Sequence, residues 1–290
     1  MGYGSPRWAS GGAIELLTNP ELARLHPTGT HPERQDRLLG LGGETVERLA
    51  SEEQLARAHV AEYLALLRQI DGRVQLDADT IASETSWEAA ILAAGIALEA
   101  VDRGGFALVR PPGHHALADR AMGFCLVNNV AVATRYAQME LGLERIAVVD
   151  FDVHHGNGTE AIFRGDGSVF FASLHQWPLY PGTGGPGTND DSTLNVPLPA
   201  GSGDVEYSAA FEEVEQAVRA FGPDLVLVSA GFDAHIEDPL AQMLVSEDGF
   251  RELARRCAAL APRVAAVLEG GYNVATLPRL VAVAQEGFSS

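Results

Sequence analysis

The sequence predicts an α/β fold, namely a single-domain, three-layer αβα sandwich around a mostly parallel, doubly wound sheet. Short apolar runs recur along the 290 residues without alternating polar positions, which is typical of strands covered on both faces. Amphipathic helical patterns lie between these runs. No internal repeat, low-complexity tract or long linker divides the sequence. We therefore expect one domain over residues 1–290.

Five continuous apolar runs predict the strands of this sheet. In chain order they are "FALV" (106–109), "IAVVD" (146–150), "SVFFASL" (168–174), "DLVLVSA" (224–230) and "VAAVLE" (264–269). Because helical segments separate them, we expect the strands to be parallel and their carboxyl ends to share one rim, where ligands bind in such sheets.

Two stretches carry apolar residues at steps of three and four and charges on the opposite face, which predicts helices packed on the sheet. The second helix is expected to end at Gly222, since a glycine followed by Pro223 commonly terminates a helix. The apolar positions are Ile91, Ala94, Leu98 and Val101 in the first stretch, and Tyr207, Phe211, Val214, Val218 and Phe221 in the second.

The composition excludes some classes of function. A formal net charge of −19 and a pI near 4.7 repel phosphate backbones and anionic membranes, so we expect no nucleic-acid or membrane partner. A basic or cationic substrate is compatible with this charge.

Cys125 and Cys257 lie in segments predicted to be interior, and the first ten residues lack the apolar region of a secretory signal. A reducing, cytoplasmic location is therefore expected.

Four polar clusters each follow a predicted strand: 110–115, 150–158, 231–239 and 269–273. Within them, Asp152 and His154 are two positions apart and point to the same side of an extended segment. Asp233 arrives from another strand end. Two carboxylates and one imidazole give a divalent cation three protein ligands and leave one position open for water, as in catalytic zinc sites. Fe²⁺, Mn²⁺ or Co²⁺ could replace Zn²⁺ in so oxygen-rich a set.

The remaining residues of these clusters supply the other groups that hydrolysis needs. His114 and His115 can serve as a base and its electrostatic partner. Tyr272 could direct its hydroxyl group at a developing oxyanion. Asp150 and Asn157 could accept N–H bonds that fix the histidine tautomers.

Each of these residues has a structural alternative when it is taken alone. Paired histidines are more often packed or solvated than catalytic, Asp233 could cap a helix, and Arg34 could be a surface charge. The conjunction of all four clusters at strand ends favours a metal hydrolase. Three further histidines lack such a conjunction and are interpreted as structural: His59, His175 and His235.

Taken together, these residues resemble the zinc-dependent histone deacetylase family, which has the arginase/deacetylase fold. The motifs are collinear from His26 to Tyr272. They are "HPER" (31–34), "RPPGHH" (110–115), "GFC" (123–125), "DFDVHHGNGT" (150–159), "SLH" (173–175), "YPGTG" (180–184), "SAGFDAH" (229–235) and "LEGGY" (268–272).

The resemblance implies a role for each catalytic residue. Asp152, His154 and Asp233 would bind zinc, and His115 would be the general base. His114 would be paired with Asp150. Other implied roles are Tyr272 polarising the amide carbonyl, and a structural K⁺ close to Asp150 and Ser173.

The resemblance also implies a substrate site. Phe124 and Tyr180 would form two walls of a narrow tunnel for an acyl-lysine-like chain, and Arg34 would lie near the channel that receives acetate. Asp79 resembles a rim aspartate that holds the substrate backbone. Gly123 and Gly271, within the "GFC" and "LEGGY" motifs, belong to the same substrate site.

Three positions depart from the commonest family pattern. Asn157 and the "SAGFDAH" wording point to class II and to bacterial deacetylase-like amidohydrolases. Tyr180 stands where many members have phenylalanine. Leu240 stands where polyamine-specific relatives have a glutamate, which favours an acyl-lysine or another neutral acylated amine as the substrate.

The sequence therefore predicts a metal-dependent amidohydrolase that removes an acetyl or short acyl group from a primary amine. Its alternatives are an amidohydrolase of acetylated polyamines or small acylamines, and an arginase-like hydrolase with two metals. A cysteine hydrolase using Cys125 and His115 is a further alternative. The last is a non-catalytic protein that binds acylated amines.

Overall fold

An eight-stranded, wholly parallel sheet forms the centre of the protein in a computed structural model that describes residues 13–290. The N-terminal segment without a secretory pattern lies outside the described residues. The strand order is β2-β1-β5-β10-β9-β6-β7-β8. The bounds are β1 Leu16–Thr18, β2 Glu44–Thr45, β5 Phe106–Ala107, β6 Ile146–Asp150, β7 Val169–Gln176, β8 Thr193–Leu198, β9 Leu225–Ala230 and β10 Val264–Leu268. A separate antiparallel hairpin pairs β3 (Val74–Gln75) with β4 (Ile81–Ala82).

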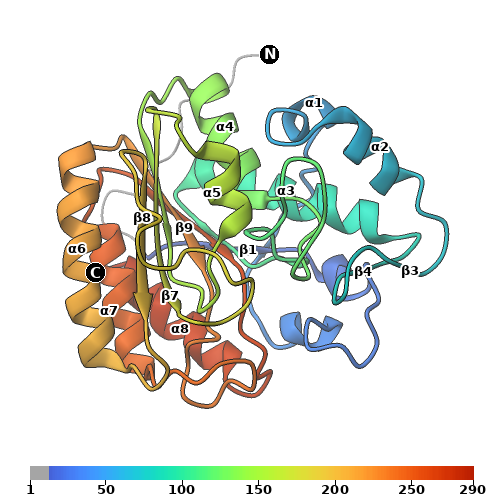
Figure 1. The fold of residues 1–290 in the computed structure, drawn as a ribbon. Coiled ribbons are helices and arrows are strands. Elements are labelled where there is room, and N and C mark those ends of the chain that lie inside the picture. Colours follow the sequence, from blue (N-terminus) through green and yellow to red (C-terminus); the bar gives the residue numbers. More distant parts are fainter. Residues whose placement is uncertain (1–12) are drawn as a thin grey trace.

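Helices cover both faces of this sheet, which makes three layers (Figure 1). α6 (Asp204–Phe221), α7 (Glu247–Ala258) and α8 (Leu277–Phe288) lie on one face, and α3 (Ser86–Arg103), α4 (Asn129–Leu141) and α5 (Asn157–Phe163) lie on the other. The shorter α1 (Glu52–Leu55) and α2 (Ala61–Arg68) lie beyond α3, away from the sheet. Two 3₁₀ helices, η1 (Pro20–Ala23) and η2 (Gln35–Leu38), precede them. The predicted fold class is confirmed.

The sequence patterns locate the central strands well and the outer ones poorly. All five predicted runs contain a strand, and their residues are almost wholly buried because helices cover both faces. β1 and β2 are too short to show a pattern, and β8 contains Asn195 and Pro197. The second predicted helix ends as expected at Gly222, whose φ of 67° is left-handed.

The register of the strands brings the polar clusters together. Asp150 at the end of β6 pairs with Ser173 on β7 and with Ser229 on β9. Leu268 at the end of β10 pairs with Ala230. The segments that follow these strands therefore emerge side by side at one rim. Across residues 13–290, no helix is both long and apolar enough to cross a membrane.

A buried ion cluster joins the N-terminal segment to this rim. Arg110 donates through Nε and Nη2 to the two carboxylate oxygens of Glu33, each over 2.9 Å, and both side chains are fully buried. Its Nη1 donates to the carbonyl oxygens of Leu22 and Leu25. Paired in this way, the buried charges fix the segment containing η1 and η2 beside the residues that follow β5.

Candidate active site

Three ligand-type side chains converge beyond the ends of β6 and β9. His154 Nδ1 lies 3.1 Å from Asp152 Oδ1 and 3.1 Å from Asp233 Oδ2, and both aspartates are fully buried. Ligands about 2.1 Å from a tetrahedral zinc ion lie roughly 3.4 Å apart, so this spacing fits a divalent cation. The adjacent strands β6 and β9 create this proximity, as the cluster pattern predicts.

The other oxygen of each aspartate is already occupied by the backbone. Asp152 Oδ2 accepts the N–H of Gly270 over 2.7 Å, and Asp233 Oδ1 accepts that of Val153 over 2.9 Å. The remaining oxygen of each faces His154 Nδ1, and Asp152 Oδ1 also accepts the backbone N–H of His154 over 2.9 Å. Burial and the nearby Asp152 charge raise the pKa of Asp233. A cation would relieve this repulsion between two buried carboxylates.

Gly270 is required by the close approach of the chain to this cluster. A Cβ atom there would lie 2.0 Å from Asp233 Oδ2 and 2.5 Å from Asp152 Oδ2. The next residue, Gly271, has a φ of 116°, a conformation that side-chain-bearing residues rarely adopt. The two glycines therefore let the segment after β10 pass close to the candidate metal ligands and continue to Tyr272.

The two histidines that follow β5 have different environments. His114 Nδ1 donates to Asp150 Oδ2 over 2.9 Å, and its Nε2 lies 3.8 Å from Asp152 Oδ1. His115 Nδ1 donates to Asn157 Oδ1 over 2.8 Å, so its partner is uncharged. The His114–Asp150 pair is the one that the family resemblance implies, and Asn157 accepts an N–H bond from a histidine.

The histidines' pKa values diverge accordingly. Burial alone would lower the pKa of His114, but the carboxylates of Asp152 and Asp150 raise it to about 10. Burial and the charges of His114 and His154 hold the pKa of His115 well below its usual value. Such a separation suits one charged and one neutral imidazole in the same site.

Tyr272 follows β10 and is held from three sides. Its backbone N–H donates to Asp238 Oδ2 over 2.7 Å, the Arg37 guanidinium lies 4.8 Å from its ring centroid, and the Phe124 ring lies 5.6 Å away. Burial raises the pKa of Tyr272 well above its usual value, so the phenol keeps its proton near neutral pH.

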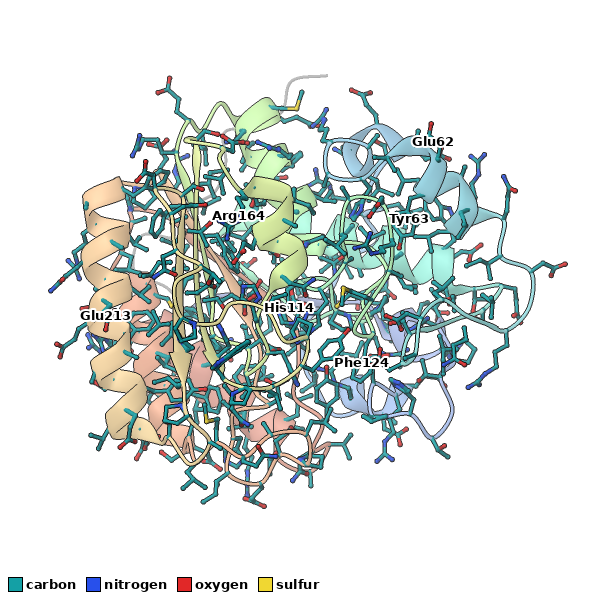
Figure 2. The ribbon with its side chains drawn as sticks, in the orientation of Figure 1. Glu62, Tyr63, His114, Phe124, Arg164 and Glu213 are labelled. Carbon is teal, nitrogen blue, oxygen red and sulfur yellow. The ribbon has the colours of Figure 1, made fainter. Side chains whose placement is uncertain are left out.

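Aromatic rings flank the approach to the candidate metal ligands. Phe124 is half-buried with a φ of 71°, and Figure 2 shows it nearer than His114 to the N-terminal segment. The Tyr180 ring lies 5.2 Å from that of His115 and 6.3 Å from that of His154, and the residue is 36% exposed. Gly123, next to Phe124, leaves room for the His115 ring, because a Cβ atom on Gly123 would lie 2.5 Å from His115 Cδ2.

Two further candidate residues lie in loops near this approach. Asp79 is half-buried at the β3–β4 turn, where its carbonyl oxygen accepts from His31 Nε2 over 3.0 Å. Burial raises the pKa of Tyr180 and the Asp79 charge raises it further, which places Asp79 near that wall. Leu240 is half-buried in the loop after β9, and its N–H donates to Asp238 Oδ1 over 3.0 Å.

The expectation for Arg34 is corrected by the structure. The Arg34 side chain is 41% exposed and lies 3.4 Å from Asp36, at the surface. Of the two arginines in this segment, Arg37 is buried, and it donates through Nε to the carbonyl oxygen of Gly271 over 2.7 Å and through Nη2 to that of Glu269 over 2.5 Å. The reason is local: Arg34 precedes η2, whereas Arg37 lies on its inward side.

Two buried carboxylates were not among the residues predicted. Asp238 accepts backbone N–H groups from Tyr272, Asn273 and Leu240, and burial together with the Asp233 charge raises its pKa to about 7. Glu269 Oε2 accepts the N–H groups of Gly113 and His114 over 2.6 and 3.1 Å. The only sign of Asp238 and Glu269 in the sequence is that each is an acidic residue within one of the four polar clusters, which were selected for other residues.

Cys125 has the properties of a structural thiol. It is fully buried, its S–H donates to the carbonyl oxygen of Gly123 over 3.3 Å, and burial raises its pKa well above the usual value. A neutral, enclosed thiol is a poor nucleophile, which disfavours the cysteine hydrolase alternative. His59 and His175 bind backbone carbonyl oxygens through ring nitrogens, as expected of structural histidines.

Comparisons with known proteins show the family of this chain. The family described as histone deacetylase domain matches residues 23–288. Histone deacetylase 10, chloroplastic, of Oryza sativa subsp. japonica is 42% identical over 264 residues, which cover 80% of this chain and 60% of that protein. The histone deacetylase-like amidohydrolase of Pseudomonas aeruginosa is 40% identical over 250 residues, covering 79% of this chain and 66% of that protein.

A solved structure shows the same likeness in three dimensions. The crystal structure of the HDA15 HD domain matches with a TM-score of 0.90 and 34% identity, covering 97% of this chain and 89% of that chain. The chain therefore belongs to the histone deacetylase family, in which its relatives include proteins named as deacetylases and amidohydrolases.

Proposed function

We propose that this chain is a zinc-dependent amidohydrolase that removes an acetyl or short acyl group from an acylated primary amine. The observation that carries the proposal is the convergence of Asp152, His154 and Asp233 within 4.8 Å of one another, next to two histidines and a tyrosine. Zn²⁺ is the proposed cation, with Fe²⁺, Mn²⁺ or Co²⁺ as substitutes. When bound, it supplies Lewis-acid activation of water and of the amide carbonyl.

The chain's own residues would divide the proton transfers between them. His115, neutral and within reach of the metal ligands, accepts a proton from the attacking water. His114, kept charged by Asp150 and Asp152, stabilises the negative charge that develops as the attacking water loses its proton. Tyr272 donates its phenolic hydrogen to the substrate carbonyl oxygen, which becomes negative as water adds.

The substrate proposed is an acylated lysine side chain or a similar neutral acylated amine. Phe124 and Tyr180 would contact the apolar chain, Asp79 would bind the backbone at the rim, and Gly123 and Gly271 would leave room for the amide. Leu240 offers no charge to a cationic chain, so acetylated polyamines are the alternative substrate class. We place the enzyme in the cytoplasm as one catalytic domain without a nucleic-acid or membrane partner.

A structural K⁺ near Asp150 and Ser173 is part of the proposal. These two residues are paired in the register of β6 and β7, and both are fully buried. A buried carboxylate oxygen and a buried hydroxyl oxygen are ligands suited to a hard cation.

The decisive experiment couples metal content to hydrolysis. Purified protein should contain one divalent ion per chain and hydrolyse an acetyl-lysine peptide, with acetylated polyamines and small acylamines assayed alongside. Asp233→Asn should lower both zinc affinity and activity, since the amide removes one negative charge from the ligand set. Asp36→Asn, at the exposed pair with Arg34, is the control and should change neither. Unchanged zinc affinity in Asp233→Asn would contradict its assignment, and two ions per chain would favour the arginase-like alternative.

A further inference from the structure

The carboxyl group of Glu269 has one oxygen in use and one unpartnered. Its Oε2 accepts the N–H groups of Gly113 and His114, whereas its Oε1 has no hydrogen-bond partner among residues 13–290. The side chain is fully buried. An unpartnered buried acceptor is unfavourable, so it marks a place where a donor from outside the described residues would be stabilising.

This carboxyl group lies beside the candidate active-site histidine His114. Glu269, His114 and Cys125 each bring one ligand-type atom within 4.8 Å of the others, and all three residues are buried. His114 Nε2 in turn lies 3.8 Å from Asp152 Oδ1, one of the atoms assigned to the cation. The Glu269 carboxyl group thus lies next to His114, which in turn lies next to the candidate metal ligand Asp152.

The shape of an amide assigns this inner region to the acyl group. The two substituents of a planar carbonyl carbon diverge by about 120°, as trigonal geometry requires. The amine substituent belongs to the large part of the substrate and must leave along the partly exposed walls, Phe124 and Tyr180. We therefore assign the acyl substituent to the buried side of the site, where Cys125 and Glu269 lie beside His114.

We propose that Glu269 is a specificity-determining residue that selects short acyl groups bearing a hydroxyl group, of which glycolyl is the smallest. This inference rests on the proposed amidohydrolase function. A hydroxyl group suits Oε1 in either protonation state, because it donates to a carboxylate and accepts from a carboxylic acid. An apolar acyl group of the same size leaves Oε1 unpartnered.

The reaction is the same hydrolysis with a different acyl group. The amide C–N bond breaks and a C–O bond forms to the oxygen of water. One hydrogen of the water goes to the amine, and the glycolic acid released transfers its proton to that amine or to solvent. No oxidant or further reactant is required.

Two substrates of equal size isolate the polar contact. Glycolyl-lysine and propionyl-lysine peptides differ only in a hydroxyl group in place of a methyl group, so their ratio of kcat/KM reports the partner of that group. The wild-type enzyme should favour glycolyl by about tenfold, the value of one ordinary hydrogen bond. Each ratio is measured within one enzyme, so a variant with a generally lower rate still gives a valid result.

Variants of Glu269 and of a rim residue complete the experiment. Glu269→Met should bring the glycolyl-to-propionyl ratio to within about twofold of one, whereas Glu269→Gln keeps a polar group and should retain part of the preference. Asp79→Asn, on the amine side, is the control and should leave the ratio unchanged.

The outcomes separate this inference from the proposed function. A wild-type ratio near or below one overturns the inference, and so does a wild-type preference that survives in Glu269→Met. Activity on the acetyl peptide without any glycolyl preference leaves the amidohydrolase function in place. Absence of activity on every acyl peptide by metal-loaded enzyme overturns the function itself.

Discussion

Tyr272 is proposed to act on the transition state and takes no part in binding the cation. Tyr272→Phe removes one hydroxyl group and leaves Asp152, His154 and Asp233 in place. We expect kcat on an acetyl-lysine peptide to fall by about 10²- to 10³-fold, the usual cost of losing one oxyanion donor. Metal analysis of the same sample should show zinc retained. Loss of zinc in this variant would mean that the fall in rate reports the metal site instead.

Asp238 is a positioning residue whose carboxylate joins the loop of Tyr272 to the loop of Leu240. Asp238→Asn can keep only one of these connections, because the amide offers one acceptor oxygen. We expect about a tenfold fall in kcat, as for the loss of a charge-assisted hydrogen bond. The same substitution in a Tyr272→Phe background should have much less effect, since the hydroxyl group that Asp238 positions is already absent. An equal fall in both backgrounds would show that Asp238 acts independently of Tyr272.

At the level of elements, the sequence predicts residues that lie directly at strand ends better than residues held by loops. Asp152, His154 and Asp233 follow long apolar runs, so the parallel sheet alone brings them to one rim. The sequence pattern could not distinguish Arg37 from Arg34. The two residues are only three positions apart, and the short 3₁₀ helix η2 determines which of the two side chains is buried.

Backbone contacts and short strands could not be predicted from sequence patterns, because both depend on tertiary contacts. Asp238 acts through backbone N–H groups, which every residue type except proline possesses, so no pattern of side chains signals it. β1 and β2 pair through only two residues each, and β1 in turn is positioned by its pairing with β5. Such features are set by tertiary contacts, which a local pattern does not contain.

The segment containing η1 and η2 depends on Glu33. Burial alone would raise the pKa of Glu33, but Arg110 lowers it to about 2. A folded-state pKa below the unfolded value of about 4.3 contributes stability that is full above about pH 5 and is lost as the pH falls towards 2. Glu33→Gln should lower the free energy of unfolding at pH 7 by about 3–5 kcal/mol, because it leaves Arg110 without its carboxylate partner.

Denaturant unfolding at pH 7, 5 and 3 checks this expectation. The difference between wild type and Glu33→Gln should be largest at pH 7 and should shrink by pH 3, as the carboxylate becomes protonated on unfolding. Glu21→Gln is the matched control, since Glu21 forms an exposed pair with Arg24 and should change stability by about 0.5 kcal/mol or less. Equal destabilisation by the two substitutions would contradict the assigned role of the buried cluster.

The charge of the whole molecule acts on the substrate before any contact forms. The chain has 39 acidic and 20 basic residues, and every basic residue is arginine. The resulting negative field favours the approach of positively charged peptides, with a reach of about 30 Å at 0.01 M salt and about 8 Å at 0.15 M. Because the chain has no lysine, acyl-lysine counted in an assay comes from the added substrate alone.

Peptides that differ only in the charge around the acetyl-lysine test this field. At 0.01 M salt, kcat/KM for a peptide with flanking arginines should exceed that for one with flanking glutamates by about tenfold, mainly through KM. At 0.5 M salt the two values should approach each other, since the Debye length falls to a few ångströms. A preference that persists unchanged at high salt would instead indicate a direct contact at the rim, and Asp79→Asn would then be expected to abolish it. Equal rates for the two peptides at low salt would show that the net charge does not steer the substrate.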